Sequence, residues 1–333
     1  MNLMDKDFNY EIMKQKAKEG LEYILSAKSP LPEHARTMLP RKHELTRETI
    51  DVVITTINSM KDFGSAIKVY QMLEKSGVSL NEIIDFIRKD PLLTVKILRA
   101  ASSAYFGGVK IDSVHYAIQL LGFKNVRNIL FYQCLLDATK KTALRGSLAS
   151  VLWEHSVLTS ICASYIYQLF PSVKESTIST MGLLHDIGKF VNLELYPIRL
   201  AINNNISPYS REFDIKAERE LFGLDHADIA RLAFEQWKLE DSMGRVIGNH
   251  HLPSNIDMSN IDQKDLNYLV ALFLSNQIAK VFASEKCKNF VLTQKLSPSF
   301  HSLVNREELE KSLTTNSFFP EISTTISLLE SYV

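Results

Sequence analysis

The sequence of 333 residues lacks the features that mark secreted proteins. It has only three cysteines, Cys134, Cys162 and Cys287, which are widely spaced and form no CxxC pair. An odd number of separated cysteines does not fit a disulfide framework, so we expect reduced thiols in a cytosol. The first residues contain no apolar run of the kind that a signal peptide requires.

Long hydrophobic runs and an excess of one charge are also absent. The most apolar stretch, residues 269–283, is interrupted by Ser275, Asn276, Gln277 and Lys280, and it is too short to span a bilayer. Lysine plus arginine and aspartate plus glutamate both number 38. A broad nucleic-acid surface needs clustered basic charge. We therefore expect a soluble, cytoplasmic protein without membrane contact and without an extended nucleic-acid interface.

Strand signals are rare, and helix signals are frequent. No Asn-Gly or Asp-Gly turn joins two alternating β-branched runs. Ser79 and Glu82 have the spacing of a capping box, and Ile83, Ile84 and Ile87 behind them form an apolar stripe at helical spacing. The sequence therefore predicts an all-α fold, a multi-helix bundle with short connections.

Further helices are expected along both halves. Asp90 and Pro91 have the N-cap and N1 preferences of a helix start. Ser113 precedes a helix that Gly122 ends, and another follows over residues 124–138. In the second half we expect helices near residues 149–168, 175–193, 210–222, 226–238, 240–251 and 264–283.

The length of the chain favours about two units. We expect an N-terminal extension over residues 1–45, a central domain over 46–284 and a C-terminal helical tail over 285–333. The polar stretch 140–147 would divide the central domain into a helical bundle of residues 46–145 and a second part of residues 146–284.

Five of the nine histidines gather in the second half, at His155, His185, His226, His250 and His251. His185 is joined directly to an aspartate, and neutral imidazole and carboxylate are the usual ligands of borderline divalent metals. Adjacent helical residues point about 100° apart, so such pairs converge on one site most easily near a helix end.

Both pairs are indeed followed by a helix breaker, Gly188 or Pro253. A buried histidine can also be a hydrogen-bonded core residue. Spacing alone leaves a metal site and a core polar network both open.

The segment Leu-Leu-His185-Asp186-Ile-Gly-Lys189 resembles the signature of the HD superfamily of metal-dependent phosphohydrolases. In the first half, Asp90-Pro-Leu-Leu-Thr-Val-Lys-Ile-Leu-Arg-Ala-Ala-Ser-Ser-Ala-Tyr-Phe-Gly107 and Ile111-Asp-Ser-Val-His-Tyr-Ala-Ile-Gln-Leu-Leu-Gly122 are similar to the HDOD domain of bacterial signalling proteins. Trp153-x-His-Ser and Glu218-x-x-x-Phe-Gly-x-x-His226 also fit that family. The resemblance extends over roughly residues 50–280 and implies an HD-like helical second half.

The resemblance also implies a ligand set. His155, His185 and Asp186 match the first three ligands of an HD metal site, and Asn276 stands where the fourth ligand, an aspartate, is expected. Three further histidines match the second-metal ligands of the related HD-GYP phosphodiesterases: His226, His250 and His251. The implied cofactor is a divalent transition metal (Fe, Mn, Zn or Ni), with one ion or two.

The chain departs from these families at three places. The neutral amide of Asn276 is a poorer ligand than a carboxylate. After the paired histidines, His250-His-Leu-Pro-Ser-Asn replaces the His-His-Glu and DGxGYP run of HD-GYP enzymes. Where HDOD sequences usually have an asparagine before Ser-Ala, this chain has Ser102.

Two hypotheses of function follow from the resemblance. In the first, the chain is an HDOD-type regulatory protein that acts through contacts with signalling proteins and has a partial metal site. In the second, it is a metal-dependent phosphohydrolase with a nucleotide or phosphate ligand. Asp186 would then help to orient a water molecule that bound metal makes nucleophilic. Lys189 would steady a phosphate oxygen, although a solvated lysine at a helix end is an equal alternative.

Overall fold

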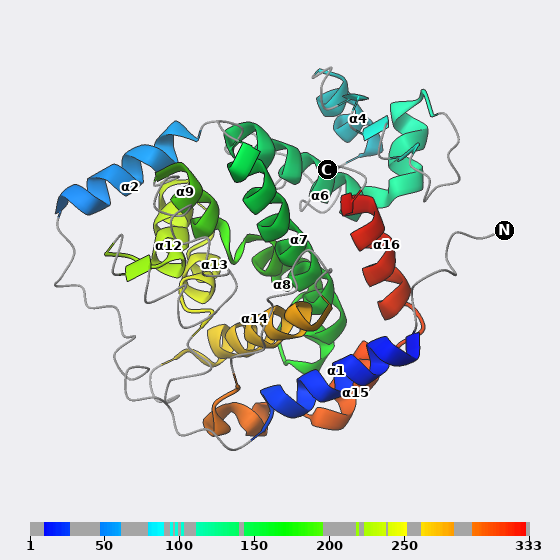
Figure 1. The fold of residues 1–333 in the computed structure, drawn as a ribbon, viewed down its shortest axis with the longest axis vertical. Helices are drawn as coiled ribbons and strands as arrows, with labels where there is room; N and C mark the ends of the chain where they lie inside the picture. Colours follow the sequence, from blue (N-terminus) through cyan, green and yellow to red (C-terminus); the bar gives the residue numbers. More distant parts are fainter. Residues whose placement is uncertain are drawn as a thin grey trace. The chain divides into compact units, whose positions relative to one another are not determined.

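The computed structural model describes residues 10–26, 47–60, 79–89, 94–95, 97–98, 101–102, 111–139, 143–195, 218–219, 223–237, 239–251, 261–282 and 295–330. All elements in these residues are helices, which confirms the all-α fold (Figure 1). None of the helices in the described ranges is long and apolar enough to cross a membrane.

The described residues divide into two compact units. The first lies within Met60–Trp153 and Ser323–Val333, and the second within Asn9–Ser59 and Glu154–Ile322. Helix α7, Ala143–Ile166, begins in the first unit and continues into the second, so the polar stretch expected to divide them is helical from Ala143 onward. The domain boundaries predicted at residues 45, 145 and 284 stay predictions.

Helices α4 (Leu80–Arg88) and α6 (Val114–Thr139) pack together in the first unit. The capping box is confirmed, because the Ser79 amide donates to Glu82 Oε2 at 2.8 Å and the Glu82 amide donates to Ser79 Oγ at 3.3 Å. The apolar stripe behind it is buried in a core that also includes Val114 and Ile118.

The predicted helix end at Gly122 is present as a break inside α6. Gly122 has φ 74°, a left-handed conformation that glycine adopts without steric cost. Ser102, the residue that departs from the family pattern, accepts a hydrogen bond from the backbone amide of Ile111 at 3.0 Å. The expected helix start at Asp90 and Pro91 lies outside the described residues.

The second unit contains α1 (Tyr10–Ile24), α2 (Arg47–Ser59), most of α7, α8 (Glu175–Leu184), α9 (Ile187–Leu195), α12 (His226–Gln236), α13 (Asp241–Ile247), α14 (Gln263–Phe282), α15 (Arg306–Leu313) and the start of α16 (Phe318–Glu330), with 3₁₀ turns at Tyr167–Leu169 and Pro298–Leu303. Helix α14 is buried along nearly its whole length and packs against α1, α8 and α13. Helix α12 packs against α2, α9 and α13 (Figure 1).

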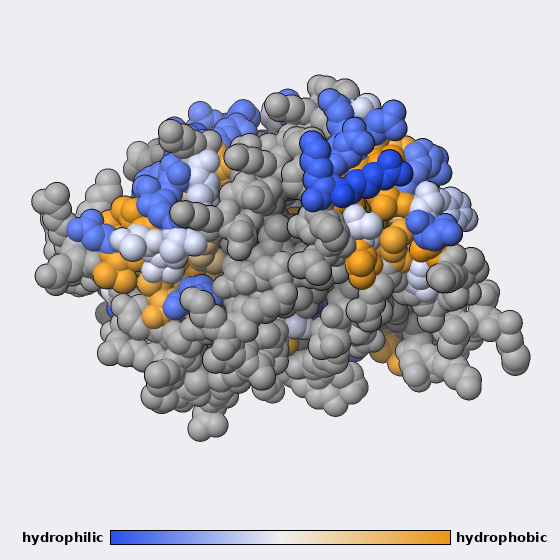
Figure 2. Space-filling model, turned by 90° about the horizontal axis from the view of Figure 1, so that it is seen from above, coloured by the Kyte–Doolittle hydropathy of each residue, from blue (hydrophilic) through white to orange (hydrophobic). Residues whose placement is uncertain are grey.

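Helix α1 comes from the predicted N-terminal extension and packs against α14 and α15. The extension therefore supplies core residues, including Leu21 and Ile24. Cys162 is buried in α7, while the side chain of Cys134 and residue Cys287 lie outside the described parts. In Figure 2, hydrophobic residues reach the surface in separate patches between hydrophilic ones.

Candidate metal centre

The His-Asp pair lies at a helix junction. His185 and Asp186 separate α8 from α9, so the segment 175–193 forms two helices. Helix α9 then runs so close to α12 that a methyl group at Gly188 would overlap the carbonyl group of His226. Glycine at this position therefore allows the His-Asp pair and His226 to approach each other.

The other predicted ligands come from four helices or their ends. His155 and Asn276 lie within α7 and α14, His226 is the first residue of α12, and His250 and His251 follow α13. Hydrogen bonds and short contacts join all seven predicted ligands into one cluster in the second unit. Their role as metal ligands stays a prediction.

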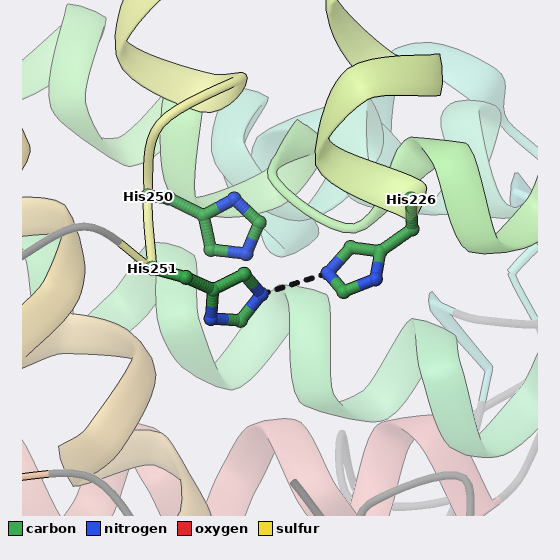
Figure 3. Close-up of side chains that lie close together, drawn as sticks. All are labelled: His226, His250 and His251. Carbon is green, nitrogen blue, oxygen red and sulfur yellow. Dashed lines mark hydrogen bonds between the residues drawn. The ribbon is translucent and has the colours of Figure 1, made fainter. Parts of the chain in front are cut away.

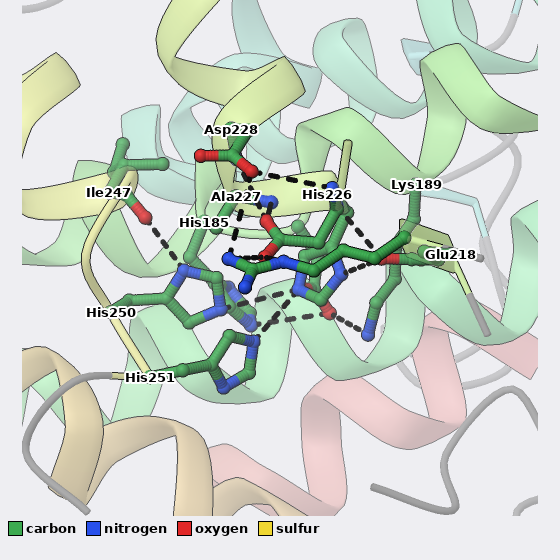
Figure 4. A network of polar contacts seen from close by, with 12 residues as sticks. His185, Lys189, Glu218, His226, Ala227, Asp228, Ile247, His250 and His251 are labelled. Carbon is green, nitrogen blue, oxygen red and sulfur yellow. Dashed lines mark hydrogen bonds and ion pairs between the residues drawn. The ribbon is translucent and has the colours of Figure 1, made fainter. Parts of the chain in front are cut away.

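The carboxylate of Asp186 is the centre of this cluster. Figure 4 shows His185, His226 and His250 around it, together with Lys189 and Glu218. The Oδ1 atom of Asp186 lies 3.4 Å from His226 Nε2 and 3.7 Å from His250 Nε2. Its Oδ2 atom lies 3.3 Å from His185 Nε2 and 3.8 Å from His155 Nε2. The Asp186 side chain is 2% exposed, so one buried charge faces four imidazoles.

Hydrogen bonds at Nδ1 fix the orientation of three of these rings. Nδ1 of His185 bonds to the Gly182 carbonyl at 2.8 Å, and Nδ1 of His250 bonds to the Ile247 carbonyl at 2.7 Å. Nδ1 of His226 bonds to a carboxylate oxygen of Glu218 at 2.6 Å. An Nδ1 atom that donates its hydrogen leaves the Nε2 lone pair of a neutral ring available. The Nε2 atoms of His185 and His250, which have no hydrogen-bond partner among the described residues, lie next to the Asp186 carboxylate.

His251 extends the cluster on the Oδ1 side of Asp186. Its ring and those of His226 and His250 face one another, as Figure 3 shows. Nε2 of His251 lies 2.8 Å from Nε2 of His226, and the two nitrogens form a hydrogen bond in which the tautomers decide the donor. The possible ligand atoms of the three histidines lie within 4.8 Å of one another.

Among the buried atoms near the Asp186 carboxylate, His185 Nε2, Asp186 Oδ1 and His250 Nε2 have no hydrogen-bond partner in the described residues. Buried polar atoms without partners are costly, and acceptor atoms that face one another repel. In a tetrahedral site with metal–ligand bonds of 2.0–2.2 Å, ligand atoms lie about 3.3–3.6 Å apart. The 3.4 Å separation at Oδ1 falls within this range and the 3.7 Å separation lies just above it, so a divalent cation there would satisfy Asp186 Oδ1 and His250 Nε2.

The electrostatics of the cluster favour cation binding. Burial lowers the pKa of His155, His250 and His251 well below the usual range, and neighbouring histidines lower it further. Burial alone would raise the pKa of Asp186, but His185 and Lys189 outweigh it and hold this pKa well below its ordinary value. His155, His250 and His251 are thus neutral and Asp186 is ionised, the protonation states that a metal ion requires.

Glu218 is a member of the site to which the sequence assigned no role. It is buried, and its Oε2 atom accepts hydrogen bonds from both the amide and Nδ1 of His226. Burial lowers the pKa of His226, but Glu218 outweighs it and raises this pKa above the ordinary value. The spacing of Glu218 and His226 in the family-like motif was the available signal, but only the fold shows that the two side chains meet.

The neighbour of Glu218 strengthens this arrangement. Arg219 bonds to Asp225 through Nε at 2.9 Å and through Nη2 at 2.8 Å. Asp225 is the N-cap of α12 and accepts from the amides of Ala227 and Asp228. Two consecutive residues therefore hold the first turn of α12, the turn that carries His226.

Lys189 lies in the first turn of α9 and bonds to Asp186 rather than standing free in solvent. Its Nζ atom donates to Asp186 Oδ2 at 3.0 Å, and its side chain is 13% exposed. The interpretation of Lys189 as a solvated lysine at a helix end is therefore wrong, because the side chain is mostly buried and forms an ion pair with Asp186.

Comparison with solved structures shows the same fold in three proteins. A proposed signal transduction protein from Marinobacter aquaeolei VT8 has 17% identity and a TM-score of 0.59, with 97% of this chain and 66% of that chain covered. This chain therefore spans just under two thirds of that relative. An HDOD domain protein of unknown function from Geobacter sulfurreducens has 17% identity and a TM-score of 0.52, with 97% of each chain covered. A proposed phosphohydrolase from Shewanella amazonensis SB2B has 16% identity and a TM-score of 0.52, with 85% of this chain and 98% of that chain covered.

At these identities the similarity concerns the fold. No curated protein matches the sequence. The model of the HDOD domain family does match it, over residues 63–253. That range exceeds half of the sequence and includes six of the seven clustered residues, and the chain belongs to the HDOD family.

Proposed function

We propose that this chain is a regulatory HDOD module that acts through contacts with signalling proteins and holds a divalent transition metal ion in its second unit. The ion would bind to Asp186, His226, His250 and His251. The observation that carries the proposal is the convergence of two imidazole Nε2 atoms, those of His226 and His250, on Asp186 Oδ1, all three side chains being buried.

The ligand types define the class of metal. Three imidazole nitrogens and one carboxylate oxygen suit Zn, Fe, Mn or Ni better than Mg or Ca, which prefer all-oxygen sites. When bound, such an ion supplies a positive charge that joins ligands from several helices. In this chain those ligands come from the start of α9, the start of α12 and the end of α13.

A regulatory role is favoured because the groups that hydrolysis would use are occupied within the protein. Lys189, the candidate for a phosphate contact, bonds to Asp186. Asn276, which stands at the fourth ligand position, bonds to Nε2 of His155 at 3.0 Å. A bound ion would instead link α9, α12 and α13, which is a structural role, and the proposed ligands for it lie at the ends of these helices.

Metal analysis of protein purified without chelator tests this proposal. We expect about one transition-metal ion per chain in the wild type and strong loss in His250→Ala. We also expect chelator to lower the melting temperature of the wild type but not of the variant, since a ligand of the native state alone stabilises it. Lack of stoichiometric metal in the wild type after exposure to Zn²⁺, Fe²⁺ and Mn²⁺ would contradict the proposal.

The second candidate is a metal-dependent phosphohydrolase, which the histidine and aspartate cluster itself favours. Asp186 would accept a proton or orient water, and Lys189 would have to leave Oδ2 to contact a phosphate group. Assays with cyclic dinucleotides and simple phosphodiesters decide between the two. Turnover that Mn²⁺ or Fe²⁺ supports and that Asp186→Ala abolishes would establish the enzyme.

A further inference from the structure

The two oxygens of Asp186 have different partners. Oδ1 has no hydrogen-bond partner in the described part of the chain and faces His226 and His250. Oδ2 accepts a hydrogen bond from Lys189 and faces His185 and His155. Either side has ligand atoms close enough for a metal ion, so distance alone does not distinguish them.

On the Oδ2 side, Lys189 already supplies the positive charge. Its backbone amide bonds to the Asp186 carbonyl at 2.9 Å, and its ammonium lies 3.0 Å from Oδ2. The lysine is thus held over Asp186 by the first turn of α9. A buried ammonium needs a carboxylate partner, and a second metal ion at Oδ2 would take that partner away.

His155 is occupied in a similar way. Its Nε2 atom lies 3.0 Å from Asn276 Oδ1, and both residues are buried. If the oxygen of the Asn276 amide faces the ring, Nε2 of His155 donates to that oxygen. If the amide is flipped so that its nitrogen faces the ring, Nε2 accepts from that nitrogen. The atom that should bind metal is engaged in both cases.

The Oδ1 side differs from the Oδ2 side, because metal binding there displaces only the proton of the hydrogen bond between His226 and His251. The Nε2 atoms of His226 and His251 lie 2.8 Å apart and form a hydrogen bond, so one of the two nitrogens carries the hydrogen. A cation that binds both nitrogens releases this hydrogen as a proton, as metal binding to histidine commonly does. His251 is partly exposed, which gives the proton a route to solvent.

The balance of charge in the cluster also favours one bound divalent ion over two. Asp186 and Glu218 are carboxylates that contact the clustered histidines in the described part of the chain. One divalent ion and Lys189 already outweigh them. A second divalent ion would add two positive charges without an added carboxylate, since position 276 is an amide. Unbalanced charge of this size is expensive in a buried site.

We propose that this chain binds one divalent ion, on the Oδ1 side of Asp186, and that Lys189 and Asn276 take the place of a second ion on the Oδ2 side. The inference rests on the proposed metal site and defines its stoichiometry. It predicts that a second ion can be accommodated once the lysine is removed and a carboxylate is supplied at position 276.

The test compares metal per chain in the wild type and in the double variant Lys189→Met and Asn276→Asp, after equilibration with Mn²⁺ and removal of excess. We expect one ion in the wild type and two in the double variant. The electron paramagnetic resonance spectrum should be that of isolated Mn²⁺ in the wild type and of an exchange-coupled pair in the double variant. Lys264→Met, an exposed lysine on the same helix as Asn276, is the matched control and should bind one ion.

The outcomes separate the two proposals. Two ions in the wild type would overturn the one-ion inference and leave the metal site intact. A folded double variant that still binds one ion would also overturn it. No ion in the wild type would contradict the proposed function as well. If the double variant does not fold, the stoichiometry and spectrum of the wild type decide alone.

Discussion

Glu218 holds His226 at two points, since its Oε2 atom lies 2.8 Å from the backbone amide and 2.6 Å from Nδ1 of this histidine. The carboxylate thereby fixes the ring so that Nε2 of His226 lies 3.4 Å from Asp186 Oδ1. A carboxylate behind a histidine ligand fixes the tautomer of the ring and increases its basicity. Glu218 is therefore expected to determine how strongly the site binds metal.

The substitution Glu218→Gln should weaken metal binding by about 10–100-fold, because the amide cannot match the charge of the carboxylate. Glutamine can still accept from the His226 amide, so the fold should remain. Titration with Zn²⁺ under competition from a chromophoric chelator measures the affinity. Glu307→Gln, an exposed glutamate on α15, is the control. An unchanged affinity in Glu218→Gln would show that Glu218 is not needed for the site.

Gly188→Ala should destabilise the second unit, because the added methyl group overlaps the carbonyl group of His226. Overpacking of this kind costs about 1–3 kcal/mol. Gly122→Ala is the comparison, since nothing lies within 4 Å of its added methyl group and the cost is only that of φ 74°. Urea unfolding followed by circular dichroism, with and without metal, measures both. Only Gly188→Ala should also weaken metal binding.

Acidification should destabilise the metal-free protein. The pKa values of His155, His250 and His251 are lowered in the folded state, so below pH 6.5 the unfolded chain binds more protons than the folded chain. The stability that these groups contribute is therefore complete above pH 6.5 and is lost as the pH falls. His226, whose pKa is raised, acts in the opposite direction.

The urea concentration at the midpoint of unfolding, measured in the presence of chelator between pH 7.5 and 5.5, tests whether the stability falls on acidification. His250→Asn should make the decline with pH shallower, since it removes one of the three groups. A midpoint that rises on acidification would mean that the raised pKa of His226 dominates.

Asp186→Ala should lower the melting temperature more than His155→Ala. Asp186 faces four imidazoles and pairs with Lys189, so its removal leaves a mostly buried ammonium without this partner. Removing one partner of a buried ion pair typically costs about 3–5 kcal/mol. Added metal should restore neither stability nor metal content in Asp186→Ala. If Asp186→Ala has the melting temperature of the wild type and chelator changes neither value, the cluster is a polar core network without metal.

Much of the fold could be predicted from local sequence. Ser79 and Glu82 form the predicted capping box because both hydrogen bonds are made within four residues. Gly122 breaks α6 where the sequence predicts a helix end, since only the backbone of that residue decides the conformation. The positions of the histidines and Asp186 on separate helices were also visible, because family-like motifs mark them.

What the sequence could not supply depends on contacts between distant segments. The packing of α1 on α14 joins residues far apart in the chain, and no local pattern predicts it. The bond between His155 and Asn276 spans 121 positions. The difference between the two oxygens of Asp186 also arises from tertiary structure. The orientation of this carboxylate decides that Oδ2 bonds to Lys189 and that Oδ1 faces His226. The sequence by itself therefore determined the helices and the residue types of the site, whereas tertiary packing decided which lone pairs remain available for a metal ion.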